Sequence, residues 1–336
     1  MTKRRSVTAL AAGAAFTLLL TACGGDDDSD SSGSDTTTDD SGSENSDTDN
    51  GDAEEGGQGS LTVGGADFTE MSVMQEIYKA LLENAGYDVS IQTASNREIY
   101  AEALVGGEID VVPEYAATFG EYLNVQANGP DAPTDSPVAT TDAAETVEAT
   151  RPLAEEEGLV LLEPAEAASQ NGFAVSAEFA QENDLETLSD LAELGEPLVF
   201  AAVEECPDRP FCQPGLESTY GLEFSEMLPL GFSSPQTKQA VADGEADLGL
   251  VGTTDGTLEG LGLVLLEDDQ ELQLADNLVP VLNEEVAGDQ AAVDALNELS
   301  DVLTTEDLAA LNAAVDAERQ LPEDVASAYL EEKGLL

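Results

Sequence analysis

Residues 61–112 read LTVGGADFTEMSVMQEIYKALLENAGYDVSIQTASNREIYAEALVGGEIDVV. Apolar residues recur at helical spacing from Met71 to Ala85 and again from Ile99 to Leu104, and glycines follow both segments. Strands are expected at 61–63, 88–93 and 109–112, the last of them stopped by Pro113. This β-α-β-α-β order predicts an α/β fold whose sheet is mostly parallel.

The same alternation continues toward the C-terminus. Further strands are expected near Leu159–Leu162, Phe173–Val175, Leu198–Ala202, Leu248–Val251 and Leu263–Leu266. Helical patterns close the chain at Ala291–Leu299, Glu306–Val315 and Pro322–Lys333.

Two short segments of the chain have similar sequences. Gly107–Val112 reads GEIDVV, Gly244–Gly249 reads GEADLG, and each follows a helical pattern. The alternative is a chance similarity of two helix-glycine-strand junctions, but a real repeat predicts two similar α/β units. The residues just beyond each strand, 114–118 and 252–255, lie where open α/β sheets bind ligands, so both segments are expected at a cleft between two lobes.

The charge excludes whole classes of function. The 336 residues include 71 acidic and 10 basic side chains, and residues 61–336 keep 58 and 7 of them, a net charge of −51. Nucleic-acid binding needs basic residues and is excluded. Such self-repulsion is screened within about 3 Å at molar salt, which favours adaptation to a salty medium over an ordinary acidic protein.

Absent residue types narrow the chemistry further. The chain contains no His, which excludes Ser-His-Asp and Cys-His catalysis and His-containing zinc sites. It also has no convincing phosphate-binding glycine loop, so any ATP hydrolysis belongs to another chain. No metal and no cofactor are expected.

The N-terminus has the pattern of a targeting segment. Residues 1–22 combine three early basic residues with an apolar run too short to span a bilayer, as in a signal peptide. Leu20-Thr21-Ala22-Cys23 resembles the lipobox of bacterial lipoproteins. The resemblance implies a diacylglycerol on Cys23 and a position on the outer face of the cytoplasmic membrane. The alternative is a simple secreted protein. Residues 23–60 then form an acidic disordered linker with a reach of about 35 Å, whose alternative role is solubility alone.

Several motifs together resemble one family. Phe68-Thr69-Glu70, Pro113-Glu114-Tyr115 with Thr118, Thr253-Thr254-Asp255-Gly256 and Tyr329–Leu335 look like the substrate-binding proteins of osmoprotectant ABC importers, which take glycine betaine, choline or carnitine. The resemblance implies a two-lobed periplasmic-binding-protein fold of type II with the ligand cleft between the lobes. It places lobe 1 at 61–168 and 256–336, and lobe 2 at 169–255.

The resemblance also suggests which residues bind the ligand. A trimethylammonium group is best held by aromatic faces, and a carboxylate needs cationic donors. Tyr115 matches an aromatic-cage position, Thr118 adds a hydroxyl, and Arg209 matches the arginine that contacts the carboxylate; a structural ion pair is the alternative role for Arg209. The remaining candidates are Asn171, Thr254 and Asp255.

The sequence departs from the family at three positions. Ala66-Asp67 stands where members carry a Lys, Gly252 where a Tyr is frequent, and Asn171 or a neighbour where another Tyr is expected. Either Phe173 and other rings compensate, or the ligand is not a simple trimethylammonium compound. Tyr100, Tyr122 and Tyr220 remain candidate rings. The helical spacing of Tyr78 favours a core position, and Tyr329 lies on the last helical pattern with no ligand motif nearby.

Cys206 and Cys212 enclose a short loop that contains Arg209. Outside the cell such a pair favours a disulfide, and a metal pair is disfavoured because no His or further Cys is available.

These features predict an extracytoplasmic binding subunit that traps a compatible solute by hinge closure and delivers it to an ABC permease with a cytoplasmic ATPase. One alternative is a sensor of the same fold that binds a small zwitterion and signals. The other is a carboxylate-based hydrolase, although no acid pair stands out.

The charge predicts salt dependence. Because the net charge of −51 is distributed through residues 61–336, the melting temperature should rise steeply from low to molar KCl as repulsion is screened. Thermal unfolding across that range, with a sucrose series as a control for viscosity, measures the effect. A flat melting temperature would contradict the prediction of salt adaptation.

Overall fold

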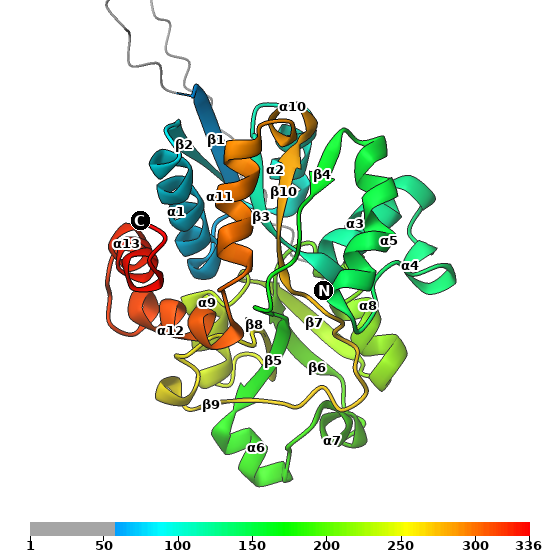
Figure 1. Cartoon of the computed structure of the whole chain (residues 1–336). Coiled ribbons are helices and arrows are strands. Elements are labelled where there is room, and N and C mark those ends of the chain that lie inside the picture. The colour runs from blue at the N-terminus through cyan, green and yellow to red at the C-terminus, as the bar shows by residue number, and fades with distance from the viewer. Residues whose placement is uncertain (1–57) are drawn as a thin grey trace, which may run out of the picture. The chain divides into compact units, whose positions relative to one another are not determined.

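The computed structural model describes residues 58–336. The expected signal peptide, Cys23 and the linker up to residue 57 lie outside the described residues. The described part contains two five-stranded sheets (Figure 1), each built from non-contiguous strands.

The first sheet has the strand order β2-β1-β3-β10-β4. Its strands are β1 (Ser60–Ala66), β2 (Asp88–Ala94), β3 (Val111–Tyr115), β4 (Leu159–Leu161) and β10 (Leu278–Asn283). The second sheet has the order β7-β6-β8-β5-β9. Its strands are β5 (Asn171–Ser176), β6 (Leu198–Ala202), β7 (Phe224–Pro229), β8 (Leu248–Gly252) and β9 (Leu263–Leu265).

The expectation of a mostly parallel sheet is wrong, because both sheets are mixed. β1 pairs in parallel with β2 and β3, and β6 with β7 and β8, as the strand-helix-strand order predicts. β10 and β5, however, are antiparallel to both of their neighbours. These two strands follow the passages of the chain from one sheet to the other, so no helical crossover within a sheet fixes their direction.

The helices agree with the expected pattern where one was given. The longer ones are α1 (Thr69–Asn84), α2 (Arg97–Val105), α3 (Ala116–Asn128), α5 (Ala143–Glu156), α9 (Pro235–Ala242), α11 (Gln290–Ser300), α12 (Thr305–Asp316) and α13 (Pro322–Lys333). The short helical segments are α4 (Ala132–Asp135), α6 (Ala177–Asn183), α7 (Leu188–Glu193), η1 (Cys206–Asp208), α8 (Gln213–Gly215), η2 (Leu216–Tyr220), η3 (Glu259–Leu261) and α10 (Glu284–Ala287). None of the helices between residues 58 and 336 has the length and hydropathy needed to cross a membrane.

Pro113 does not end its strand, contrary to expectation. It lies in the middle of β3, directly opposite Pro280 of β10. The carbonyl oxygen of Pro280 accepts a hydrogen bond from the amide of Leu162 at 3.0 Å, so Pro280 turns its polar backbone atoms away from β3. The two prolines therefore form a pair that needs no hydrogen bond across it, and the missing N–H groups cost that ladder nothing.

The repeated sequence corresponds to a repeated structure. Gly107 and Gly244 have φ values of +73° and +70° and follow α2 and α9, and the strands after them are the central strands of their sheets. The carboxylate of Asp110 accepts a hydrogen bond from the Thr62 amide at 2.6 Å, and that of Asp247 accepts one from the Val199 amide at 2.7 Å. Each repeat thus ties its central strand to the parallel strand beside it, β1 in the first sheet and β6 in the second.

Each sheet has a hydrophobic core on both faces. In β3, Val111 and Tyr115 pack with α1 and the C-terminal helices, while Val112 faces α2, α3 and α5. Figure 1 shows α1 between α13 and α11. The expected core position of Tyr78 is confirmed, with an exposed fraction of 1%, and Tyr329 is also buried, with 7% exposed. The central strands are therefore held from both sides, and their carboxyl ends are fixed in place.

Two expectations about the second lobe have different outcomes. The disulfide between Cys206 and Cys212 is present. The lobe does not end at residue 255, because β9 (Leu263–Leu265) pairs with β5 and belongs to the second sheet. The chain returns to the first sheet only between β9 and β10.

Candidate functional site

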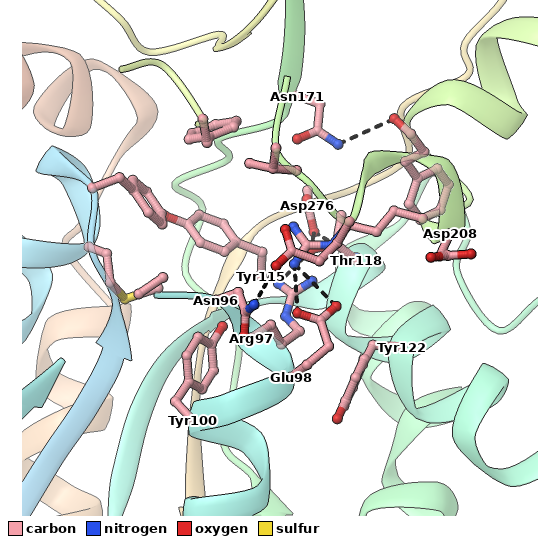
Figure 2. Close-up of a pocket in the computed structure, with 18 of the residues that line it drawn as sticks. Asn96, Arg97, Glu98, Tyr100, Tyr115, Thr118, Tyr122, Asn171, Asp208 and Asp276 are labelled. Carbon is pink, nitrogen blue, oxygen red and sulfur yellow. Dashed lines mark hydrogen bonds and ion pairs between the residues drawn. The ribbon is translucent and has the colours of Figure 1, made fainter. Parts of the chain in front are cut away.

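A cavity of about 380 Å³ is lined by residues from both lobes. Lobe 1 contributes the segment after β1, the start of α2 and the junction of β3 with α3, and lobe 2 contributes the start of β5 and the disulfide-bonded loop. Figure 2 shows Tyr115, Thr118, Arg97 and Asp276 gathered at the centre of this cavity. The carboxyl ends of β1 and β3 thus meet lobe 2 here, as the repeat analysis predicts.

Three aromatic rings from the two lobes line the cavity together. The Phe68 ring stacks with that of Tyr115, with centroids 6.5 Å apart, and meets the edge of Phe232 at 5.1 Å. Phe68 and Tyr115 come from lobe 1, and Phe232 comes from the loop between β7 and α9. Such faces suit a quaternary ammonium group, which has no N–H to donate in a hydrogen bond.

Phe232 was missed, although the sequence contained a signal for it. Gly252 stands where the family frequently carries a Tyr, and a Cβ atom at Gly252 would lie 3.4 Å from the Phe232 ring. The glycine therefore leaves room for a ring that arrives from a different segment. Phe173, the ring expected to compensate, lies instead in the second core beside Phe200 and does not line the cavity.

The candidate tyrosines fall into two groups. Tyr100 and Tyr122 line the cavity, but the Tyr100 hydroxyl donates to Glu114 at 2.7 Å and the ring is 2% exposed. Tyr220 lies elsewhere, and its hydroxyl donates to Asp268. Tyr122 is therefore the one of these three rings whose hydroxyl has no such buried partner among the described residues.

A buried ion pair underlies the cavity and was not foreseen. Arg97 donates from Nε and Nη2 to the two carboxylate oxygens of Glu114, at 3.0 and 2.8 Å. Glu114 is fully buried, and it also accepts from Tyr100 and from the Tyr115 amide. Burial alone lowers the pKa of Arg97. The charge of Glu114, its hydrogen bond, and the nearby Tyr100 and Asp276 together outweigh burial and raise that pKa above its usual range, so the guanidinium stays charged.

Thr118 connects this pair to a second carboxylate. Its hydroxyl accepts from Arg97 Nη2 at 2.9 Å and donates to Asp276 at 3.2 Å, and its amide donates to the same oxygen at 2.9 Å. Burial raises the pKa of Asp276 to about 7, although the bonds from Thr118 and the charge of Arg97 act in the opposite direction. The single hydroxyl proton of Thr118 is thus already donated to Asp276.

Arg209 joins the two lobes at the cavity. Its Nη2 pairs with both oxygens of Glu98 at 3.2 and 3.0 Å, and 31% of its side chain is exposed. Asn96 on the same lobe-1 segment donates to Glu205 of lobe 2. Arg209 is therefore both a lining residue and an interlobe ion-pair partner, the two roles that the sequence left open.

The remaining candidates are placed differently. Asn171 lines the main cavity, and its amide donates to the Phe211 carbonyl at 3.3 Å. Thr254 and Asp255 do not line it; they line a second cavity of about 300 Å³, which shares Phe68 and Phe232 with the first. Asp255 is bound there by Lys238 at 2.8 Å.

Thr254 belongs to a network between the lobes. Its hydroxyl donates to Glu70 at 2.6 Å, and the same carboxylate accepts from the Tyr115 hydroxyl at 2.7 Å and from Asn312 at 2.7 Å. Glu70 is 5% exposed. Thr254 is therefore in contact with the site through the residue that holds the Tyr115 ring.

The combined site suits a small molecule with a cationic and an anionic end. It offers aromatic faces, acidic side chains such as Glu98, Asp208 and Asp276, and two guanidinium groups. Among residues 58–336, no group of three or more His, Cys, Asp or Glu side chains is placed to hold a metal ion.

The chain is similar to proteins of one transport family. Residues 59–332 match OpuAC, described as the substrate binding domain of ABC-type glycine betaine transport systems. A glycine-betaine-binding protein from Pseudomonas aeruginosa is 30% identical over 82% of this chain and 88% of its own length, and the glycine betaine-binding protein YehZ from Escherichia coli is 26% identical over 82% and 90%. A crystal structure described as a glycine betaine/carnitine/choline ABC transporter shares the fold, with a TM-score of 0.60 and 19% identity over 82% of this chain and 99% of that one.

Asp276 should make stability depend on pH. Its pKa is about 7 in the folded protein and about 3.9 when unfolded, so the folded state holds the extra proton between these values. This contribution to stability is fully present below about pH 4 and is lost as the pH rises through 7. We expect Asp276→Asn, measured against the parent, to gain about 2–3 kcal/mol of unfolding free energy between pH 5 and pH 8.

Denaturant unfolding at the two pH values measures this difference. Asp255→Asn is the matched control. Burial alone raises the pKa of Asp255, but hydrogen bonds from Lys238, Ser233 and Thr257 hold that pKa below its usual range. The change in unfolding free energy caused by Asp255→Asn should therefore be the same at pH 5 and pH 8. An Asp276→Asn effect that is equally independent of pH would contradict the prediction.

Proposed function

The chain belongs to the OpuAC family of substrate-binding domains of ABC-type glycine betaine transport systems, and we propose that the cavity between its lobes binds glycine betaine or a close relative. As a member it is the extracytoplasmic binding component of a quaternary-amine ABC importer and not an enzyme, so the hydrolase hypothesis is excluded. The observation that carries the ligand proposal is the set of Phe68, Tyr115 and Phe232 around a cavity that also contains Arg209.

Each end of the ligand has a counterpart in the proposed site. The trimethylammonium group lies against the three rings, each worth about 0.5–2 kcal/mol, and the acidic lining adds attraction for its charge. The carboxylate takes donors from Arg209, for which it competes with Glu98. Since 40% of the Glu98 side chain is exposed, water can solvate it once Arg209 is engaged.

Transport by this component follows from closure of the lobes. Phe68 and Tyr115 come from lobe 1, whereas Phe232 and Arg209 come from lobe 2. A ligand that contacts all four side chains therefore stabilises the closed form. The closed form is then the one presented to a permease, whose cytoplasmic ATPase supplies the energy.

We further propose that Cys23 carries a lipid and that the acidic linker tethers the domain outside the cytoplasmic membrane. The Leu20-Thr21-Ala22-Cys23 run supports this. Mass spectrometry of the protein isolated from its native membrane should find a diacylglyceryl-modified N-terminal residue at position 23, and Cys23→Ser should release the protein into the medium. An unmodified Cys23, or cleavage at another position, would contradict the anchor.

Calorimetric titration in molar KCl tests the ligand site. Tyr115→Ala should weaken glycine betaine binding by about 1–2 kcal/mol, or roughly 5- to 30-fold, because one aromatic face is lost. Arg209→Ala should cost about 2–3 kcal/mol with glycine betaine and much less with choline, which has no carboxylate.

Matched variants separate contact from folding. Tyr115→Phe removes the bond to Glu70 but keeps the ring, so it should lose clearly less affinity for glycine betaine than Tyr115→Ala. Arg151→Ala removes an arginine that pairs with Glu148 and Glu163 away from the cavity and should change neither ligand. A parent that binds neither glycine betaine nor choline refutes the ligand proposal, and an Arg209→Ala protein with parent-like binding of glycine betaine refutes the carboxylate site.

A further inference from the structure

Arg97 is held more rigidly than any other guanidinium in the cavity. The Glu114 carboxylate takes its Nε and Nη2, and the Thr118 hydroxyl takes Nη2 as well, so two of its three nitrogens are fixed by buried partners. The side chain is 12% exposed, and Arg97 lines the main cavity. A side chain fixed in this way loses little entropy when it binds a further group.

The third nitrogen, Nη1, is free. No hydrogen bond joins Nη1 to an acceptor among the described residues. Nη1 is also not among the unpaired side-chain atoms that protein atoms enclose completely. Because Arg97 lines the cavity, Nη1 is the nitrogen of this guanidinium that is available to a molecule bound there. A guanidinium presents five N–H donors in one plane, so donors remain there for an acceptor in the cavity.

The neighbouring carboxylates already accept from other donors. Glu114 accepts from Arg97, from the Tyr100 hydroxyl and from the Tyr115 amide, and it is fully buried. Oδ1 of Asp276 accepts from both the amide and the hydroxyl of Thr118. Glu98 is paired with Arg209.

We propose that Arg97 is a specificity-determining residue of the ligand site, which donates from Nη1 to the carboxylate of a bound zwitterion while Arg209 donates to it from the other lobe. The inference rests on the proposed function and adds to it a preference for ligands with a carboxylate over ligands without one. A carboxylate has two oxygens and about four acceptor positions, enough for a guanidinium from each lobe. Arg97 is the fixed half of this pair, because Glu114 holds it in the absence of ligand, whereas Arg209 must exchange Glu98 for the ligand.

Two variants test the role of Arg97 without leaving a buried charge unpaired. Arg97→Lys keeps the charge beside Glu114, but an ammonium group cannot bind Glu114 through two nitrogens and still present a third to the cavity. Arg97→Gln combined with Glu114→Gln replaces the ion pair by two neutral amides. Melting temperatures show which proteins are folded, and Arg151→Lys is the matched control outside the cavity.

The readout is the ratio of the dissociation constants for glycine betaine and choline. We expect either folded variant to lose about tenfold or more in affinity for glycine betaine and less than threefold for choline, so that the ratio shifts toward choline. In a double-mutant cycle, Arg97→Lys and Arg209→Ala should be non-additive for glycine betaine, since both residues contact one carboxylate. Arg151→Lys should leave the ratio unchanged.

Three outcomes decide between the proposals. An unchanged ratio in a folded Arg97 variant, while the parent still binds glycine betaine, overturns the role of Arg97 and leaves the proposed function intact. Equal losses for both ligands also overturn it, because they show that Arg97 only supports the architecture of the site. A parent that binds neither ligand refutes the proposed function itself.

Discussion

The buried carboxylate of Glu70 joins the three parts of the chain that form the site. A buried charge must be satisfied by donors, and Glu70 takes one from Tyr115 at the end of β3, one from Thr254 just beyond the end of β8 and one from Asn312 on α12. These three donors come from lobe 1, from lobe 2 and from the returning C-terminal segment. The position of the Tyr115 ring is thus coupled to the relative position of the lobes.

The elements of the fold that follow from local pattern were predictable, and those that depend on long-range pairing were not. The repeat at Gly107 and Gly244 indicated two similar units, because a helix, a left-handed glycine and a strand are encoded within a few residues. The direction of β5 and β10 depends on where the chain enters each sheet, and no local pattern encodes that. For the same reason the predicted strand end at Pro113 was wrong, because a proline opposite another proline can be recognised only when both strands are known.

The site shows the same division. Tyr115, Thr118 and Arg209 were expected from motifs, and Asn171 from a departure from the family pattern; all four line the cavity. Phe232 was missed, because Gly252 indicates room for a ring but not that the ring comes from a segment 20 positions away in the sequence. Arg97 carried a signal of its own in the sequence: only seven basic residues stand beside the 58 acidic residues from position 61 onward, so each cation there is a candidate for binding an anionic group.

The strongly negative chain explains why two arginines matter for a ligand with no net charge. A field from acidic side chains attracts the ammonium end of a zwitterion and repels its carboxylate, so the chain's charge by itself favours a simple cation such as choline. At molar salt this field is screened within about 3 Å, and contacts at hydrogen-bond distance then decide the affinity. In the proposed site, the donors of Arg97 and Arg209 act at that distance. Selection between a betaine and a cation without a carboxylate would then depend on these two guanidinium groups.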